Sequence, residues 1–273
     1  MTTSSSPGRF QTGTDKLLVD VTGAVAVLTL NNPAKHNALS LDMRASLPGL
    51  LRQLQADDEV RVVVVTGAGN RAFASGADIS EFAHQRTSAA DRADYDRAQE
   101  AIGRAWESLE KPVIAMIRGF CMGGGLLTAL QADMRIAADD SQFGIPAARL
   151  GLGYGFASVL TLMNLIGPAW TSEVLLSARR FSAAEALQMG LVNRVVTATE
   201  LRDEVMTLAR RIAANAPLTV AACKAAIREA GRQPGQRDMT RVRSMIEACY
   251  RSQDYLEGQR AFAEKREPQF TGR

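Results

Sequence analysis

Two segments rich in small residues stand where backbone amides can take part in chemistry. Residues 71–78 read Arg-Ala-Phe-Ala-Ser-Gly-Ala-Asp and follow the β-branched run 62–66. Residues 119–125 read Gly-Phe-Cys-Met-Gly-Gly-Gly, follow the apolar run 113–117 and lead into a helix-forming stretch. Small residues let backbone N–H groups approach a ligand closely. Two such donors, one of them at the beginning of a helix, suit an oxygen atom that becomes negative during a reaction.

Strands and helices around the two segments must fix where these amides lie. The alternation of apolar runs, turns and amphipathic stretches predicts an α/β core, and helical signals dominate from Tyr154 onward. The expected strands are a hairpin over residues 16–31 and single strands over 62–66, 113–117, 134–138 and 192–196. The expected helices include 41–55 capped by Ser40, 78–84, 91–109, one opened by a capping box at Ser182 and Glu185, and 218–228 after Pro217.

The chain divides into three parts by composition. Residues 1–15 are polar and predict a disordered tail. Residues 16–200 carry the strand, turn and helix alternation and form the expected α/β core. Residues 201–273 have mostly helical patterns and form a C-terminal helical region.

Composition and charge argue against several classes of protein. The 273 residues include 32 basic and 29 acidic side chains, a net charge of +3 that gives no nucleic-acid footprint. No run of about 18 uninterrupted apolar residues predicts a membrane span, and the N-terminus lacks the layout of a secretory signal. The three cysteines, Cys121, Cys223 and Cys249, are widely spaced and predict a reducing cytoplasm rather than a disulfide framework. No Cys and His cluster has metal-ligand spacing.

Several short motifs occur in a fixed order and together point to one family. They are Asn37-Ala38-Leu39, Ala74-Ser75-Gly76-Ala77-Asp78, Gly123-Gly124-Gly125, Ala132-Asp133, Gln142-Phe143-Gly144, Gly190-Leu191-Val192 and Phe262-Ala263-Glu264-Lys265-Arg266. With this set, the chain resembles the crotonase, or enoyl-CoA hydratase/isomerase, superfamily from about Leu17 to Phe270. Each string is weak alone, and the ordered set is specific.

The resemblance implies a fold, a substrate class and a reaction class. The fold is a spiral of β-β-α units followed by a C-terminal helical region that packs across subunits, in a trimer or a dimer of trimers. The substrate is an acyl-CoA thioester of fatty acid metabolism, and coenzyme A arrives as part of the substrate with no permanently bound cofactor. The enzyme class is a lyase or an isomerase. The backbone N–H groups of Ala77 and Gly124 become the oxyanion donors that bind the thioester carbonyl and its enolate.

The resemblance also assigns residues to the coenzyme A cleft. The loop that borders the adenine and phosphate end contains Lys35, Asn37 and Ala38. The residues around adenine and pantetheine are Ala74, Asp78 and Ile79. The C-terminal pair that approaches coenzyme A is Phe262 and Lys265. Lys35 either attracts phosphate or is a solvated loop lysine. Asp78 either faces the substrate or caps the helix that follows. Phe262 either approaches coenzyme A or packs against a helix.

Two positions depart from the family pattern. The hydratases of the family use two glutamates, and the corresponding positions are Leu127 and Ala147 here. Neither side chain exchanges a proton, so the usual hydration is doubtful. Tyr154 lies in a segment similar to one in the methylmalonyl-CoA decarboxylase branch, and its phenol donates well but is a poor base. It either meets the substrate or packs between glycine-rich turns. His84 is either an acid or base at the acyl end or a surface residue.

Other functions compete with this interpretation. The strongest rival is a catalytically silent acyl-CoA-binding protein in which Leu127 and Ala147 line an apolar acyl tunnel. Residues 67–72 mimic a dinucleotide fingerprint, but residues 73–76 interrupt the helix that must follow. A serine hydrolase is disfavoured because no Gly-x-Ser-x-Gly elbow occurs. Turnover of an enoyl or malonyl thioester separates an enzyme from the silent protein.

Overall fold

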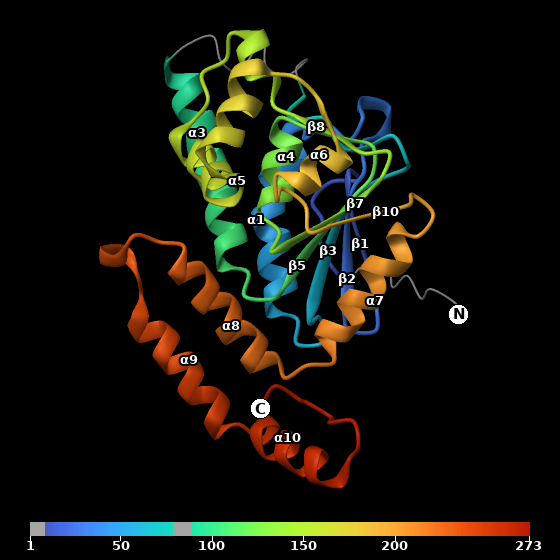
Figure 1. The fold of residues 1–273 in the computed structure, drawn as a ribbon, viewed down its shortest axis with the longest axis vertical. Coiled ribbons are helices and arrows are strands. Elements are labelled where there is room, and N and C mark those ends of the chain that lie inside the picture. Colours follow the sequence, from blue (N-terminus) through green and yellow to red (C-terminus); the bar gives the residue numbers. More distant parts are fainter. Residues whose placement is uncertain (1–8, 79–88) are drawn as a thin grey trace.

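The strands form two sheets in the computed structural model, which describes residues 9–78 and 89–273 and, for 89–96, the backbone alone (Figure 1). The larger sheet has the strand order β1 (Leu17–Thr22), β2 (Val25–Leu30), β3 (Val62–Gly67), β5 (Val113–Ile117), β7 (Met134–Ala138) and β10 (Arg194–Val196). The smaller sheet has the order β4 (Ala72–Ala74), β6 (Phe120–Met122), β8 (Gln142–Gly144) and β9 (Phe181–Ser182). Strands from β2 to β10 in the larger sheet run parallel.

The chain builds these sheets by repeating one unit. The pairs β3–β4, β5–β6 and β7–β8 each give their first strand to the larger sheet and their second to the smaller one. A helix follows each pair. The helices of the core are α1 (Leu41–Ala56), α3 (Ala89–Ser108), α4 (Gly124–Leu130), α5 (Phe156–Ser177), α6 (Ala183–Gln188) and α7 (Leu201–Ala213). The repeat is the spiral of β-β-α units that the family resemblance implies.

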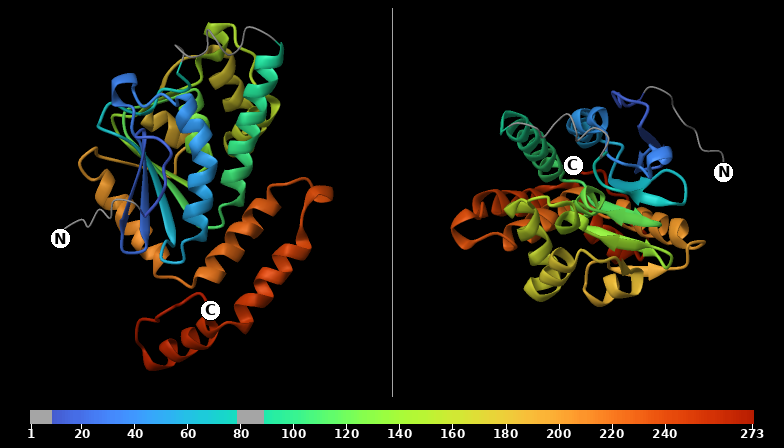
Figure 2. Two further views of the ribbon diagram at one scale, coloured as in Figure 1. Left: turned by 180° about the vertical axis from the view of Figure 1, so that it is seen from behind. Right: turned by 90° about the horizontal axis from the view of Figure 1, so that it is seen from above.

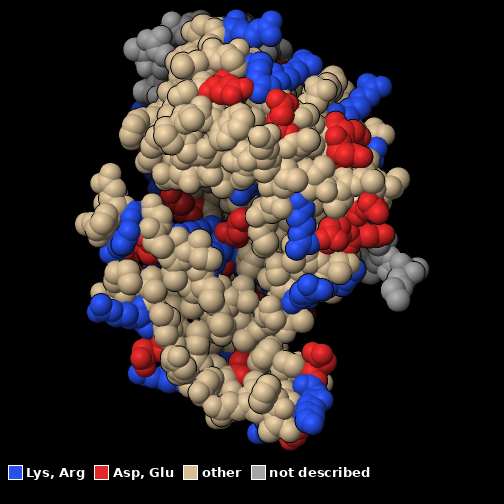
Figure 3. All heavy atoms as spheres, viewed as in Figure 1, with Lys and Arg blue, Asp and Glu red and all other residues tan. Residues whose placement is uncertain are grey.

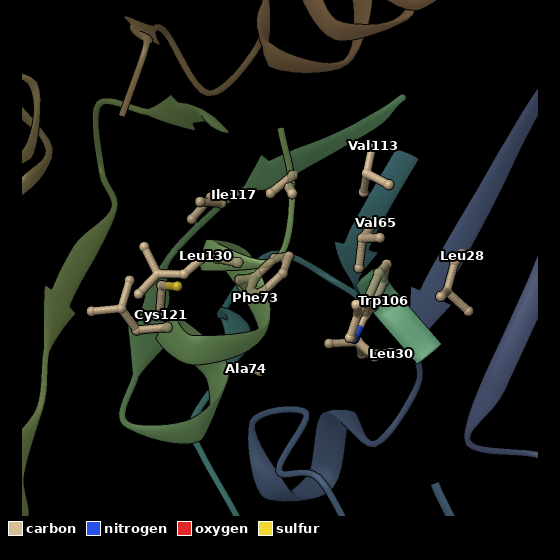
Figure 4. Close-up of a cluster of buried hydrophobic side chains, with 14 of the residues drawn as sticks. Leu28, Leu30, Val65, Phe73, Ala74, Trp106, Val113, Ile117, Cys121 and Leu130 are labelled. Carbon is tan, nitrogen blue, oxygen red and sulfur yellow. The ribbon is translucent and has the colours of Figure 1, made fainter. Parts of the chain in front are cut away.

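The apolar run of β3 is buried because both faces of the larger sheet are covered. Successive strand residues point to opposite faces. Val63 and Val65 therefore join the cluster that includes α1 and the end of α3, and Val62 and Val64 join the cluster made with α7. A strand covered on both sides reads as a continuous apolar run rather than an alternating one. Figure 4 shows the first cluster, with Phe73 between Trp106 on one side and Leu130 and Cys121 on the other.

Most expected elements lie close to their predicted positions. The hairpin is confirmed as antiparallel β1 and β2, joined through Gly23. The capping box is confirmed at the start of α6, where Ser182 and Glu185 satisfy each other's backbone N–H groups. Helix α8 begins with Pro217 in its first turn, as predicted. Ser40 precedes α1, but its hydroxyl donates to Asp42 and makes no capping hydrogen bond.

The disordered tail predicted for residues 1–15 is wrong for residues 9–15. Arg9 forms two hydrogen bonds of 2.8 Å with Asp57. The backbone N–H of Gln11 donates to the side-chain oxygen of Gln53, whose side-chain nitrogen donates to the carbonyl of Gln11. Phe10 packs against the core. The hydrogen bonds reach Gln53 in the C-terminal half of α1 and Asp57, the residue after it. A short polar segment is ordered here by long-range contacts that local composition does not reveal.

The C-terminal helical region separates from the core later than residue 200. Helix α7 buries Leu201, Val205 and Ala209 against the larger sheet and therefore belongs to the core. The helices α8 (Pro217–Ala230), α9 (Met239–Arg251) and α10 (Gln253–Glu264) extend away from it (Figures 1 and 2). The described residues also form the short 3₁₀ helices η1 (Pro33–Lys35), η2 (Pro146–Leu150) and η3 (Pro234–Gln236). The packing boundary thus lies near Pro217.

Helix α5 is the one helix among the described residues that is long and apolar enough to cross a membrane, by length and composition alone. Its backbone leaves the helical conformation at Gly167, where φ is 74° and ψ is 170°. A span needs about 20 continuous helical residues, and neither half of α5 supplies them. Exposed apolar side chains such as Phe156, Leu160 and Met163 lie on its first half, and the surface over α5 is largely uncharged in Figure 3.

Candidate active site

The two small-residue segments lie side by side because their strands are neighbours. Strand β4 pairs with β6 in parallel, with Ala72 opposite Phe120 and Ala74 opposite Cys121. The carboxyl ends of parallel neighbours meet at the same edge of a sheet. Residues 75–78 and 123–125 leave the smaller sheet together at that edge.

Glycine is required for this close approach at position 125, whereas a Cβ at position 124 would make an ordinary contact. A Cβ atom built on Gly124 would lie 3.4 Å from the backbone nitrogen of Ala77. A Cβ on Gly125 would lie 2.2 Å from the carbonyl oxygen of Ala74, which no real side chain allows. Gly76 and Gly123 have φ angles of 110° and 50°, in the region that favours glycine. The small residues therefore bring two main chains into contact.

The direction of the Ala77 amide is fixed by Leu39. The backbone N–H of Leu39 donates to the carbonyl of Gly76 at 2.7 Å. In a trans peptide the C=O and N–H groups point in opposite directions, so the Ala77 N–H points away from Leu39. Gly124 is the first residue of α4, so its N–H has no carbonyl acceptor within the helix. Within the described part of the chain, neither N–H donates to a backbone carbonyl. Both remain available for a ligand oxygen.

The loop before α1 supports the Ala77 segment. The backbone N–H of Ser75 donates to the carbonyl of His36 at 3.0 Å, and its hydroxyl donates to the carbonyl of Lys35 at 3.1 Å. The ammonium of Lys35 lies 2.6 Å from the carboxylate of Asp78, which is 7% exposed. These contacts bind residues 35–39 to residues 75–78 along their whole length.

The side chain of Asn37 holds this loop from the other side. Its amide nitrogen donates to the carbonyls of Ala68 and Ala72 at 2.9 and 2.7 Å, and its oxygen accepts from the N–H of Asn32 at 3.0 Å. The residue is 1% exposed. Asn37 and His36 both adopt the left-handed conformation, with φ near 55° and 51°. The Asn37 side chain, assigned to the coenzyme A cleft by the family pattern, is thus occupied inside the fold.

Leu127, Ala147 and Tyr154 pack against one apolar cluster. They come from α4, from η2 and from the loop before α5, and each is partly buried. The phenolic oxygen of Tyr154 is itself buried. The thiol of Cys121 in β6 is fully buried, and burial raises its pKa, which argues against a role as a nucleophile.

The structure does not bring every predicted site residue to this edge. Phe262 is 88% exposed and lies on α10, and Lys265 ends that helix, far from α4 (Figure 1). Ile79 and His84 lie outside the described residues. Ala38 and Ala74 are buried beside the two loops.

Two residues of the site lie in the quoted motifs, but the sequence assigned neither of them a role of its own. Leu39 orients the Gly76–Ala77 peptide, and Ser75 links the two loops. Both act through hydrogen bonds between segments about 36 to 40 positions apart, and any residue with a backbone N–H can make the Leu39 contact. Among residues 9–78 and 89–273, no group of three or more His, Cys, Asp or Glu side chains is placed to hold a metal ion.

Comparisons with known proteins agree with this architecture. Residues 20–273 match the family model described as enoyl-CoA hydratase/isomerase. The chain is 35% identical to the crotonyl-CoA hydratase of Syntrophomonas wolfei over 256 residues, 94% of this chain and 98% of that protein. It is 36% identical to the carnitinyl-CoA dehydratase of Salmonella enteritidis over 92% of this chain and 96% of that one.

A solved structure gives the same result in three dimensions. The enoyl-CoA hydratase/carnithine racemase of Magnetospirillum magneticum superposes with a TM-score of 0.89 at 36% identity, over 95% of this chain and 97% of that one. At this identity and coverage the spiral fold and the C-terminal helical region are shared features. The resemblance inferred from the ordered motifs is therefore confirmed, and the chain belongs to the enoyl-CoA hydratase/isomerase family.

Proposed function

We propose that this protein binds an acyl-CoA thioester and stabilises its enolate with the backbone N–H groups of Ala77 and Gly124. The observation that carries the proposal is their proximity: the nitrogen of Ala77 lies 3.4 Å from where a Cβ on Gly124 would stand. The Leu39 hydrogen bond turns the Ala77 N–H away from the loop before α1, which supports its role as a donor to a ligand oxygen. A preorganised donor of this kind contributes about 3 kcal/mol to a transition state that gains negative charge on oxygen.

Hydration by two glutamates is expected to be weak or absent. Several relatives are named hydratases or dehydratases, which makes crotonyl-CoA the first substrate to test. Addition of water to a double bond needs one group that removes a proton from water and one that delivers a proton to carbon. Leu127 and Ala147 do neither. Their packing against an apolar cluster supports an acyl pocket without carboxylates at these positions.

Decarboxylation fits this residue set better. When the bond between the α-carbon and a carboxylate breaks, carbon dioxide leaves and the bonding electrons form the enolate, so no base is required. The two amides then stabilise the enolate oxygen, and solvent or a side chain supplies the proton to carbon. Tyr154 is proposed as the hydrogen-bond donor to the substrate carboxylate or carbonyl, supported by its packing against the same apolar cluster as Leu127 and Ala147. The role proposed for His84 is a second proton donor.

Coenzyme A is proposed to lie along the loop before α1 as part of the substrate. Backbone and side-chain groups of Lys35, Ala38, Ala74, Asp78 and Ile79 would border it. A surface pocket of about 280 Å³ lies beside this loop and is lined in part by His36, Asn70 and Arg71. These polar side chains are proposed to face the nucleotide end of coenzyme A. The chemistry requires no permanently bound cofactor, because backbone amides carry the electrostatic stabilisation.

The test compares two substitutions at one position. Gly124→Pro removes the N–H but suits the first position of a helix, whereas Gly124→Ala adds a carbon and keeps the N–H. Enoyl-, malonyl- and aryl-CoA thioesters are screened for turnover, and the best substrate is measured with both variants. Gly124→Pro is expected to lose roughly 100-fold or more in kcat and Gly124→Ala far less. Equal activity of folded Gly124→Pro and wild type would reject the oxyanion site. Binding without turnover of any thioester would support the silent acyl-CoA-binding protein.

We also propose that the protein self-associates as a trimer or a dimer of trimers in the cytoplasm. The projecting helices carry exposed apolar side chains, among them Ile227, Ile246, Tyr250 and Phe262. A hollow of about 580 Å³ also opens between α8 and α9. Apolar groups gathered on a projecting arm favour burial against another copy. Sedimentation equilibrium measures the mass, and a monomer at micromolar concentration would contradict the proposal.

A further inference from the structure

We propose that Lys35 and Asp78 form a positioning pair that holds the Ala77 amide in place and neutralises the charge beside it. This inference deepens the proposed function and rests on it. It gives Lys35 a role inside the protein in place of attraction to a coenzyme A phosphate. Lys35 and Asp78 are positioning residues in this scheme, because they act through the Gly76–Ala77 peptide.

The pair closes a set of contacts around that peptide. The Leu39 N–H donates to the Gly76 carbonyl at 2.7 Å, and the Asp78 N–H donates to the Leu39 carbonyl at 3.4 Å. Residues 39 and 77 thus make a parallel bridge on which the direction of the Ala77 N–H depends. The 2.6 Å ion pair between Lys35 and Asp78 lies at the end of this bridge. It is a side-chain contact that ties the carboxyl end of the Ala77 segment to the loop before α1.

The loop needs such an anchor because its own conformation is unfavourable. His36 and Asn37 are consecutive residues in the left-handed region, each costing of order 1 kcal/mol. Asn37 fixes the loop to the turn between β3 and β4 through Ala68 and Ala72. Lys35 fixes it on the opposite side, to Asp78. A loop held from two sides keeps the Leu39 N–H, and through it the Ala77 amide, in one position.

The charge of the Asp78 carboxylate gives a second and separate reason for pairing it with Lys35. Asp78 is adjacent in sequence to Ala77 and its carboxylate is nearly buried. A buried carboxylate without a counter-charge is costly. It would also repel the negative oxygen that develops at the Ala77 N–H, and repulsion between like charges is strong where water is scarce. The ammonium of Lys35 at 2.6 Å offsets both effects. Removal of Lys35 alone should therefore harm enolate binding more than removal of both charges.

The experiment measures the enolate directly. A 3-ketoacyl thioester such as acetoacetyl-CoA forms an enolate with its own ultraviolet absorption band, so its fraction on the protein reports oxyanion stabilisation without turnover. Titrations use acetoacetyl-CoA and acetoacetyl-pantetheine, which lacks every phosphate of coenzyme A. The proteins are wild type, Lys35→Met, Lys35→Arg, Asp78→Asn and the double variant Lys35→Met with Asp78→Asn. Arg194→Met, which breaks the exposed pair with Glu204 on the far side of the larger sheet, is the matched control.

Lys35→Met is expected to lower enolate affinity roughly tenfold to 100-fold for both thioesters. Lys35→Arg should restore most of it, and the double variant should bind the enolate more tightly than Lys35→Met. The control should match wild type, and thermal unfolding checks that each variant is folded. A loss seen with acetoacetyl-CoA but not with acetoacetyl-pantetheine would overturn this inference alone and make Lys35 a phosphate ligand. Absence of an enolate band in wild type would overturn the proposed function and this inference together.

Discussion

Gly125→Ala is the substitution that tests the contact between the two loops most severely. Gly125 is buried in the first turn of α4. A Cβ atom there would lie 2.2 Å from the carbonyl oxygen of Ala74 and 2.7 Å from its carbonyl carbon and its Cβ. These three atoms belong to the backbone and the methyl group of Ala74 in β4, and none of them can rotate away. The start of α4 and the end of β4 must therefore move apart.

The size of the effect follows from this distance. Carbon and oxygen atoms that are not bonded stay roughly 3.3 Å apart, so the loops must separate by about 1 Å. A displacement of about 1 Å at a reacting centre costs about 100-fold in rate. Overpacking should also destabilise the fold by about 1–3 kcal/mol. Helix propensity acts in the opposite direction, because alanine is favoured over glycine by about 1 kcal/mol, and it is the smaller effect here.

The assay compares Gly125→Ala with Gly103→Ala. Gly103 lies within α3, and a Cβ atom there meets nothing within 4 Å. The control should keep wild-type enolate binding and gain up to about 1 kcal/mol in the free energy of unfolding. Gly125→Ala should lose about 100-fold in enolate affinity for acetoacetyl-CoA. If both variants bind the enolate like wild type, the two amides do not depend on close packing of the loops, and the reasoning fails.

Two further predictions concern stability. Burial lowers the pKa of Lys224 from its usual 10.5 to about 8, although Asp133 lies 2.7 Å away. Between pH 8 and pH 10.5 the unfolded chain keeps the proton that the folded chain has released. The free energy of unfolding should therefore rise with pH by up to about 3 kcal/mol. Urea unfolding at pH 7.5 and pH 10 should show this rise in wild type relative to Lys224→Met, and parallel changes in both proteins would refute it. Ser182→Ala removes the capping box of α6 and should cost about 1 kcal/mol in the same assay. The control is the exposed Ser172→Ala, which should stay within about 0.5 kcal/mol of wild type. Equal losses in the two variants would contradict the capping role of Ser182.

Local pattern was enough to predict the elements that carry strong signals. Strands β5 and β7 begin and end where the sequence places them, because both faces of the sheet are covered and only Arg135 interrupts their apolar residues. The hairpin at Gly23 and the capping box at Ser182 were predicted from chemistry within a few residues. The packing of residues 9–15 against α1 and the place of α7 in the core were not predicted, because contacts between distant parts of the chain decide them.

The sequence by itself determined the family, the small residues at 74–77 and 123–125, and the loss of the two carboxylates at Leu127 and Ala147. These features reside in residue type and order, which the printed chain contains. Only the tertiary structure decided that the Ala77 amide is turned by Leu39 and held beside a Lys35–Asp78 ion pair. Hydrogen bonds between segments about 40 residues apart leave no trace in local composition, because a backbone N–H is present at nearly every residue. The direction of a single peptide is therefore set by the fold.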